Sequence, residues 1–288
     1  MNVFKLGAAA LALAATFALP TGASAQSRGK VLVVMSSAHE LDLKDGKKYS
    51  TGYYLNEFVV PYRKLVEAGY EPVIANPNGD VPVMDVNSNN KMFFGGDDTA
   101  RANALNYAQG IQQLKHPKTL ASVVAEGTSQ YVGVFIPGGH APMVDLIKDK
   151  NLGKILVSFH DSGRTTAIIC HGPIVLLSTL QDPDAFIGSM VANDGKANSL
   201  AKGWPYAGYR LTVFSTGEEQ QLEGPNGLGG NVQFYPVNAL AEAGAHVDTL
   251  ANWHSNVVVD RELITGQQPM SAPEFGDVLV AKLNAAKH

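Results

Sequence analysis

The stretch TTAIICHGP at residues 165–173 decides the fold of this chain and contains its only cysteine, Cys170. The short, continuous apolar run before Cys170 is typical of a strand that is buried on both faces. Gly172 and Pro173 then favour a sharp turn, and residues 174–180 are expected to form a helix. The pattern therefore predicts a cysteine held at a turn between a buried strand and a helix.

A cysteine in this position is expected to be reactive, because the N-terminus of a helix carries partial positive charge and favours the thiolate. A buried small hydrophobe is the commoner role of a free cysteine. The polar Cys-His-Gly-Pro sequence argues against that role, since a plain link between strand and helix needs no histidine. We therefore predict that Cys170 is a nucleophile. For His171, a base turned back toward the thiol and a turn residue facing solvent are equally well supported.

Strands and helices alternate along the rest of the chain. Short apolar runs predict strands at 30–36, 72–75, 131–136, 166–169, 211–214 and 246–250, and a tight hairpin at 257–264. Longer stretches predict helices at 51–68, 99–114, 144–148, 151–162, 237–243 and 272–286, with loops at 39–50 and 77–94. This alternation predicts an α/β fold with a mainly parallel sheet covered by helices on both faces. Active sites in such sheets lie beyond the carboxyl ends of the strands, where Cys170 and the segment Gly138-Gly139-His140 are both expected.

Residues 1–25 resemble a secretory signal peptide. Lys5 precedes an apolar stretch at 6–19, and a small-x-small cleavage site ends at Ala25. The apolar stretch is too short to span a bilayer comfortably, which argues against a membrane anchor. We therefore expect residues 26–288 to form a single exported domain, which would be periplasmic if the cell is a Gram-negative bacterium.

Composition indicates an ordinary globular protein, with 45% hydrophobic residues, 17% charged residues and a formal net charge of -4. The absence of a basic block or stripe argues against nucleic acid as a partner. No stretch after the signal peptide is long and apolar enough to span a membrane, so we expect no membrane partner. One cysteine cannot form an internal disulfide, and an unpaired thiol in an oxidising compartment favours reactivity or intermolecular pairing.

A cysteine nucleophile needs a base, donors for an oxyanion and an orienting acid. Gly138 and Gly139 leave backbone N–H groups open to a ligand, although a plain turn would have the same sequence. Glu57 lies on the first predicted helix, where a solvated surface position is the default and an inward position toward the thiol is the alternative.

The orienting acid is expected after the strand that follows Cys170, where Glu218 and Glu219 stand side by side. Carboxylates also favour the first turn of a helix, so a structural role stays open for both. The histidines have no tight metal-ligand spacing. A site formed by His39, Glu40 and His140 ranks below chance contact, and we expect neither a metal nor a cofactor.

The segment AIICHGP at 167–173 resembles the nucleophile elbow of the ThiJ/PfpI superfamily, which has the class I glutamine amidotransferase-like fold. Four further segments resemble the superfamily in order: TGYYLNE at 51–57, FIPGGH at 135–140, LTVFSTGEE at 211–219 and LITGQQPMSA at 263–272. They resemble the first helix with its acidic residue, the oxyanion loop, the stretch with the triad acid and the C-terminal signature. The resemblance implies a flavodoxin-like domain and is nearest to the glyoxalase III and stress-chaperone branch.

Members of that branch are credited with converting methylglyoxal and water to lactate without a cofactor. The resemblance implies that Cys170 attacks the aldehyde carbon, while Glu57 hydrogen-bonds the thiol or shuttles a proton. His171 would be the general base, oriented by Glu219, although Glu218 is an alternative acid. The implied oxyanion and substrate-binding residues are Gly138, Gly139, His140 and His171. A small aldehyde would be the substrate, and family habit suggests a homodimer.

Other functions remain open at this point. A holdase chaperone with an incidental thiol would present an exposed apolar patch and would keep its activity in Cys170→Ala. A peptidase, amidase or nitrile-type hydratase would use the same elbow. A low-pKa thiol beside Glu57 would also oxidise readily and serve as a redox sensor. We favour a carbonyl-acting enzyme, glyoxalase III-like or hydrolytic, with a stress-protective role.

Overall fold

The structure is a computed structural model that describes residues 27–286. The predicted signal peptide at 1–25 lies outside the described residues. Among the residues that are described, no helix is long and apolar enough to cross a membrane.

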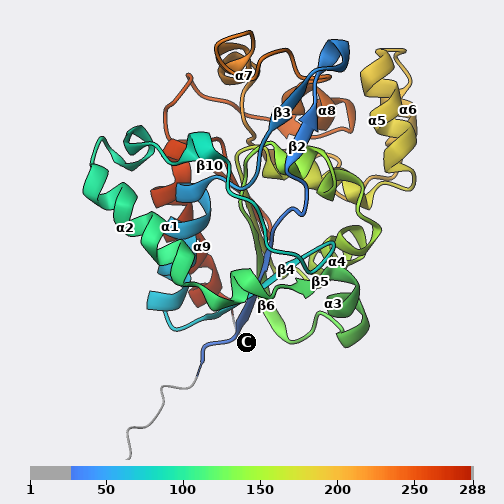
Figure 1. Ribbon diagram of the computed structural model, residues 1–288. Coiled ribbons are helices and arrows are strands. Elements are labelled where there is room, and N and C mark those ends of the chain that lie inside the picture. Colours follow the sequence, from blue (N-terminus) through green and yellow to red (C-terminus); the bar gives the residue numbers. More distant parts are fainter. Residues whose placement is uncertain (1–26, 287–288) are drawn as a thin grey trace, which may run out of the picture.

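A seven-stranded sheet forms the centre of the molecule (Figure 1). Its strands, in spatial order, are β10 (Val257–Asp260), β11 (Leu263–Gly266), β7 (Thr165–Ile169), β6 (Tyr131–Ile136), β1 (Lys30–Val34), β4 (Glu71–Asn76) and β5 (Lys118–Thr119). Neighbouring strands are parallel except β10 and β11, which form the predicted tight hairpin. The sheet confirms the predicted fold class.

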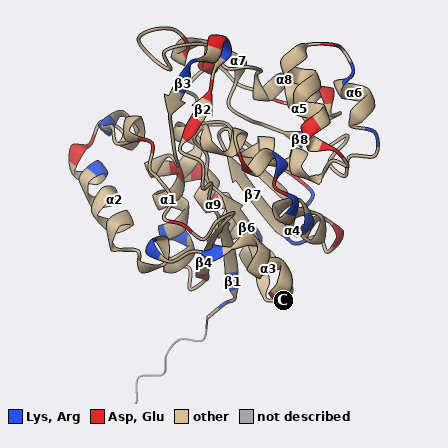
Figure 2. Ribbon diagram, turned by 45° about the vertical axis from the view of Figure 1, so that its right-hand side comes forward, with Lys and Arg blue, Asp and Glu red and all other residues tan. Residues whose placement is uncertain are grey.

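Helices cover both faces of this sheet, so its central strands are buried on both sides. In β1, Val31 and Val33 belong to one hydrophobic core, whereas Leu32 and Val34 belong to the other. The first core is covered by α1 (Leu55–Glu67), α2 (Asp98–Gly110) and α9 (Ala272–Ala285), and the second by α3 (Leu120–Glu126), α4 (Lys150–Asp161) and the 3-10 helix η7 (Gly172–Thr179). Strands β6 and β7 contain no charged residue, and Figure 2 shows the charges on the outer helices and loops.

The chain after η7 adds a set of short elements that carry one half of the site. They are α5 (Pro183–Ala192), α6 (Ala197–Leu200), β8 (Arg210–Leu211), α7 (Thr216–Leu222), α8 (Pro236–Glu242) and β9 (His246–Val247). Strands β8 and β9 pair with each other in a separate two-stranded sheet. The sequence pattern does not predict α3, α5, α6 or α7, because each of these helices has ten residues or fewer and short segments give no clear helical period.

Two predictions next to the elbow differ from the structure in detail. The expected strand at 211–214 is reduced to the two-residue β8, because the N–H of Thr212 leaves the ladder and donates to Oγ1 of Thr265 at 2.8 Å. The N–H of Phe214 then donates to the carbonyl of Cys170 at 2.9 Å and ties this segment to the elbow. The helix expected at 174–180 is present as the 3-10 helix η7, which begins two residues earlier.

The polar segment at 39–50, expected to be a loop, contains an antiparallel hairpin. Its strands are β2 (Glu40–Asp42) and β3 (Lys48–Ser50), and Leu41 is buried. One buried apolar side chain in a three-residue strand is too weak a pattern to predict from sequence. The predicted loop at 77–94 is irregular, with the short 3-10 helices η2 (Val86–Ser88) and η3 (Lys91–Phe94).

Candidate active site

Cys170 lies at a strained turn at the carboxyl end of β7. Its φ is 65°, in the left-handed region that residues with side chains rarely adopt. The N–H of Cys170 donates to the carbonyl of Gly266 on β11 at 2.8 Å, and its carbonyl accepts from Phe214, so neighbouring segments hold the turn from two sides. A non-glycine residue kept in this conformation is typical of functional sites.

Gly138 allows the loop after β6 to lie directly against this turn. A β-carbon on Gly138 would lie 2.4 Å from the β-carbon of Cys170 and 2.5 Å from Oε2 of Glu57. Only glycine permits so close an approach. The N–H of Gly138 faces the Glu57 carboxyl group, whereas the N–H groups of Gly139 and His171 face the sulfur. The predicted oxyanion donors are therefore divided between the thiol and Glu57.

His171 folds back toward the thiol, so the solvent-facing alternative is wrong. Its Nδ1 lies 3.3 Å from Sγ of Cys170, and its Nε2 lies 2.6 Å from Oε2 of Glu219. The imidazole is buried and stacks on the ring of Phe214, with a distance of 4.4 Å between the ring centres. Because an ionised carboxylate accepts hydrogen bonds only, Glu219 requires the proton of His171 on Nε2 and leaves Nδ1 free to accept a proton from the thiol.

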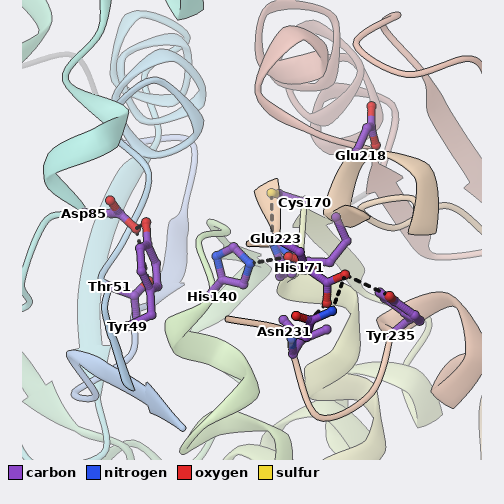
Figure 3. Close-up of polar contacts among 12 residues, drawn as sticks. Tyr49, Thr51, Asp85, His140, Cys170, His171, Glu218, Glu223, Asn231 and Tyr235 are labelled. Carbon is purple, nitrogen blue, oxygen red and sulfur yellow. Dashed lines mark hydrogen bonds and ion pairs between the residues drawn. The ribbon is translucent and has the colours of Figure 1, made fainter. Parts of the chain in front are cut away.

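The structure separates the roles of the two adjacent glutamates. Glu218 completes the capping box of α7, in which its Oε2 accepts from the N–H of Ser215 at 3.0 Å. Its Oε1 accepts from the N–H of Trp253 at 2.7 Å, and Figure 3 shows its side chain pointing away from the histidines. Glu219 is the acid that contacts His171. The Ser-Thr-Gly-Glu spacing at 215–218 is a capping-box pattern, which would have identified Glu218 as the structural residue.

His140 is a second imidazole on the same carboxylate, a contact that sequence reasoning missed. Its Nε2 lies 2.7 Å from Oε1 of Glu219, and its ring centre lies 3.9 Å from that of His171. Within the described part of the chain, Nδ1 of His140 is buried and has no hydrogen-bond partner. The ring also packs against Tyr49 in a T-shaped arrangement, with 5.6 Å between the ring centres (Figure 3).

Glu57 points inward, so the default expectation of a solvated position is wrong. The residue is fully buried, and the same helical face packs against α9 where Gly276 meets Pro61 and Lys64. Its carboxyl group lies beside Cys170 and the N–H of Gly138, but neither oxygen forms a hydrogen bond of ordinary geometry with any described residue.

Burial controls the charge on the α1 side of the thiol. It raises the pKa of Glu57 to about 8, so this carboxyl group is protonated at neutral pH. Burial and the adjacent Glu57 carboxylate also raise the pKa of Cys170 well above its ordinary value, and the N–H groups of Gly139 and His171 offset only part of this rise. This direction opposes the expected thiolate stabilised by a helix N-terminus, which stays a prediction, as does the redox-sensor hypothesis that depends on it.

The α7 side of the thiol holds separated charges. Burial alone would lower the pKa of His140, but the charge and hydrogen bond of Glu219 raise it overall. Burial and the charge of His140 lower the pKa of His171 to about 4. Burial would raise the pKa of Glu219, but the two imidazoles hold it well below its usual range. At neutral pH, Glu219 is therefore an anion and His171 is a neutral base.

A small cavity of about 10 Å³ lies against these groups. It is lined by Tyr54, His140, Cys170, His171, Phe214, Leu222, Trp253 and Pro269. Sequence reasoning missed the aromatic wall, because Phe214 and Trp253 follow no local pattern that marks them as site residues. Trp253 has a φ of 63°, a strained conformation at the surface side of the cavity.

Three of these side chains also present metal-ligand atoms. Nitrogen and oxygen atoms of His140, His171 and Glu219 lie within 4.8 Å of one another. A metal ion here would have to replace both hydrogen bonds between the imidazoles and the carboxylate. His39 and Glu40 are not part of this group, so the weak hypothesis of a site with His140 does not hold.

A cysteine elbow with an imidazole and a buried acid, at the carboxyl edge of a mainly parallel sheet, is the arrangement expected of the class I glutamine amidotransferase-like fold. The family model described as the DJ-1/PfpI family matches residues 50–181. This match agrees with the predicted resemblance of the chain to the ThiJ/PfpI superfamily. The matched range contains Glu57 and Cys170, whereas Glu219 lies beyond it.

Relatives and solved structures agree with this assignment. The protein/nucleic acid deglycase HchA of Staphylococcus aureus (strain Newman) is 28% identical over 272 residues, which cover 93% of this chain and 84% of that protein. The glyoxalase III of Candida albicans has a TM-score of 0.65 and 23% identity, covering 88% of this chain and 97% of its own. The Rapid Encystment Protein 24 kDa of Francisella tularensis has a TM-score of 0.65 and 24% identity, covering 88% and 99%. These two structures establish the fold alone.

Proposed function

We propose that this protein is a cofactor-free enzyme that uses Cys170 to act on small reactive carbonyls, and that it converts methylglyoxal and water to lactate. The arrangement that carries the proposal is a buried thiol between a protonated carboxyl group, Glu57, and a neutral imidazole, His171. The name of one relative, a protein/nucleic acid deglycase, supports a carbonyl substrate.

The first step uses the proton acceptor on one side of the thiol and the donor on the other. Nδ1 of His171 accepts the thiol proton as the sulfur attacks the aldehyde carbon and forms a hemithioacetal. The N–H groups of Gly139 and His171 stabilise the oxyanion, and Glu57 donates a proton to it. The raised pKa of Cys170 fits this scheme, because the thiol loses its proton only as the new bond forms.

The second step moves hydrogen between the two carbons of the substrate. The proton that His171 accepted from the thiol first passes to the Glu57 carboxylate, which restores both groups. Neutral His171 then takes the proton from the carbon that carries sulfur and returns it to the neighbouring carbon. The hydroxyl proton of the hemithioacetal moves to the neighbouring oxygen, which gives the lactate thioester. Water then hydrolyses the thioester and releases lactate and the free Cys170 thiol. One carbon is oxidised and its neighbour is reduced, so the reaction balances with water as its one co-reactant.

The cavity supports a small substrate. A volume of about 10 Å³ holds about one water molecule. A substrate must therefore displace part of the wall, and Trp253 is the half-buried residue that reaches the surface there. Its indole N–H is held by Oε1 of Gln221 at 2.6 Å. Movement of one side chain admits a small aldehyde more readily than a folded polypeptide.

The test is consumption of methylglyoxal and glyoxal without glutathione by the wild type, Cys170→Ala and Glu57→Gln, with His116→Gln as an exposed control. We expect turnover by the wild type and the control, none by Cys170→Ala and slow turnover by Glu57→Gln. Equal activity of Cys170→Ala and the wild type would refute the proposal. An inert wild type would direct attention to amide, peptide or nitrile substrates for the same elbow.

A holdase function is a second candidate, because one segment exposes several apolar side chains. They are Val81, Val83, Val86 and Met92. Suppression of aggregation of a heated client protein should then survive Cys170→Ala but weaken in Val86→Ser. We further propose export and a homodimer, to be tested by N-terminal sequencing of the protein isolated from its cell and by light scattering.

A further inference from the structure

Glu219 holds two imidazoles, although a cysteine nucleophile needs only one as its base. We propose that His140 binds the second oxygen of a 1,2-dicarbonyl substrate through Nδ1–H while its Nε2–H balances the charge of Glu219. This inference rests on the proposed function and adds to it a residue that selects dicarbonyls over simple aldehydes.

The first argument is the unpartnered nitrogen. The side chain of His140 is only 3% exposed, and its Nδ1 finds no partner among the described residues. Buried polar atoms in native proteins are nearly always hydrogen-bonded. The ring cannot turn to satisfy Nδ1 without breaking the 2.7 Å contact of Nε2 with Glu219. His140 also lines the cavity that contains Cys170, so a ligand in that cavity can supply the missing partner.

The second argument is the charge around the ring. The groups that face His140 are Glu219 on α7, His171 after β7, Tyr49 on β3 and, behind Tyr49, Asp85 before η2 (Figure 3). Both carboxylates favour the imidazolium, in which both ring nitrogens are donors. Two cations at 3.9 Å between ring centres would repel each other, so His171 stays neutral. His140 thus carries the charge and His171 carries out the proton transfer.

The third argument is the chemistry of the substrate. When Cys170 adds to the aldehyde carbon, the neighbouring carbonyl oxygen lies one carbon further on. Negative charge develops on that oxygen when the proton leaves the first carbon, and an imidazolium N–H stabilises such charge strongly. A simple aldehyde has no second oxygen and leaves the donor unpaired. A buried donor without its partner discriminates between ligands by about 10- to 100-fold.

Two substitutions separate the two roles of His140. In His140→Gln the side-chain amide nitrogen lies near the position of Nε2, which keeps a donor for Glu219 and removes the cavity donor. In His140→Asn the amide lies near the position of Nδ1, which keeps the cavity donor and removes the contact with Glu219. His116→Gln, on the exposed surface, is the control for loss of a histidine.

The readout is the alkylation of Cys170 by iodoacetamide, because it does not depend on turnover. We expect methylglyoxal to protect the wild type at concentrations about 10- to 100-fold lower than propionaldehyde, and His140→Gln to lose this preference. In His140→Asn the preference remains. Both variants remove the neighbouring cation, which raises the pKa of His171. The pH below which the alkylation rate falls, the acid limb of the pH–rate profile, should therefore rise by about one to two units from its wild-type position near 4.

Each role has an outcome that overturns it. If His140→Gln binds both aldehydes more weakly by the same factor, Nδ1 binds a water molecule or maintains the shape of the pocket. The proposed selection of dicarbonyls is then wrong. An acid limb that stays in place in His140→Asn removes the charge role. Nitrogen-15 NMR of wild-type imidazoles checks both roles without a substitution, since a neutral His140 would contradict them. If dicarbonyl selectivity is present but methylglyoxal is never consumed, the proposed function fails and this inference stands.

Discussion

The two sides of the Cys170 thiol carry the same type of residue in opposite states. On the α1 side, Glu57 is fully buried without an ordinary hydrogen bond to the described residues, and it keeps its proton. On the α7 side, Glu219 is equally buried but accepts from two imidazoles and is ionised. Partners, rather than burial alone, therefore set the charge of a buried carboxyl group. The thiol gains a proton donor on one side and, through His171, a proton acceptor on the other.

The largest effect is expected when the α7 side loses its charge through Glu219→Gln. A neutral amide leaves the imidazolium that we propose at His140 without its counter-charge and no longer holds the proton of His171 on Nε2. We expect kcat/KM for methylglyoxal to fall by about 10³- to 10⁴-fold and the free energy of unfolding to fall by about 3–5 kcal/mol. Steady-state kinetics and urea unfolding measure these changes. A loss of activity below tenfold would show that the carboxylate does not control the base.

A smaller effect on activity is expected from Glu57→Gln, which keeps the shape of the α1 side and removes its ionisable proton. We expect kcat to fall by about 100-fold, the usual contribution of a general acid. Because the protonated form is the active one, wild-type activity should fall as pH rises through about 8, the pKa of Glu57. The pH–rate profile of Glu57→Gln should lack this alkaline limb. If the alkaline limb persists in Glu57→Gln, it reports the titration of another group and not of Glu57.

The fold could be predicted from sequence because its signals are local. The buried strand before Cys170 and the alternation of strands and helices determine the parallel sheet, and the elbow with Gly138 places the nucleophile at its carboxyl edge. The polar hairpin at 39–50 was not predictable in this way, because its few apolar residues produce no clear period. Helix α7 also lacks a clear apolar period, and only the capping-box spacing at 215–218 marks its start in the sequence.

The state of the site could not be predicted, because it depends on contacts between distant segments. The inward position of Glu57 requires α9 to pack on the same face of α1, which the sequence of α1 does not reveal. The burial that raises the pKa of Cys170 comes from residues on several elements and outweighs the local effect of the turn. The pair formed by His140 and Glu219 joins segments 79 residues apart.

The contrast between protonated Glu57 and ionised Glu219 also predicts how the free energy of unfolding depends on pH. The pKa of Glu57 is about 8 in the folded protein and near 4.5 in the unfolded chain. Between these values the folded state binds one more proton, so the contribution of Glu57 to stability falls by about 1.4 kcal/mol for each unit of rising pH. Glu57→Gln removes this dependence. The difference in unfolding free energy between the variant and the wild type should therefore shift in favour of the variant from pH 5 to pH 8, measured by urea unfolding.

The depressed pKa of Glu219 acts in the opposite direction, since its contribution to stability is lost as pH falls through the folded pKa. This loss occurs below the window used for Glu57 and is shared by the wild type and Glu57→Gln. A difference between the two proteins that stays constant from pH 5 to pH 8 would mean that Glu57 is already ionised in the folded state.

The smallest effect is expected from Glu218→Gln. This variant tests whether the contacts of each glutamate, rather than its residue type, determine its effect on activity. Glutamine can still complete the capping box with Ser215, but its single oxygen cannot also accept from Trp253 as the carboxylate does. We expect a loss of about 1 kcal/mol in unfolding free energy. kcat/KM should change by less than about threefold, because Glu218 does not touch either imidazole. Equal losses in Glu218→Gln and Glu219→Gln would mean that total negative charge on α7, and not the contact with His171, supports the base.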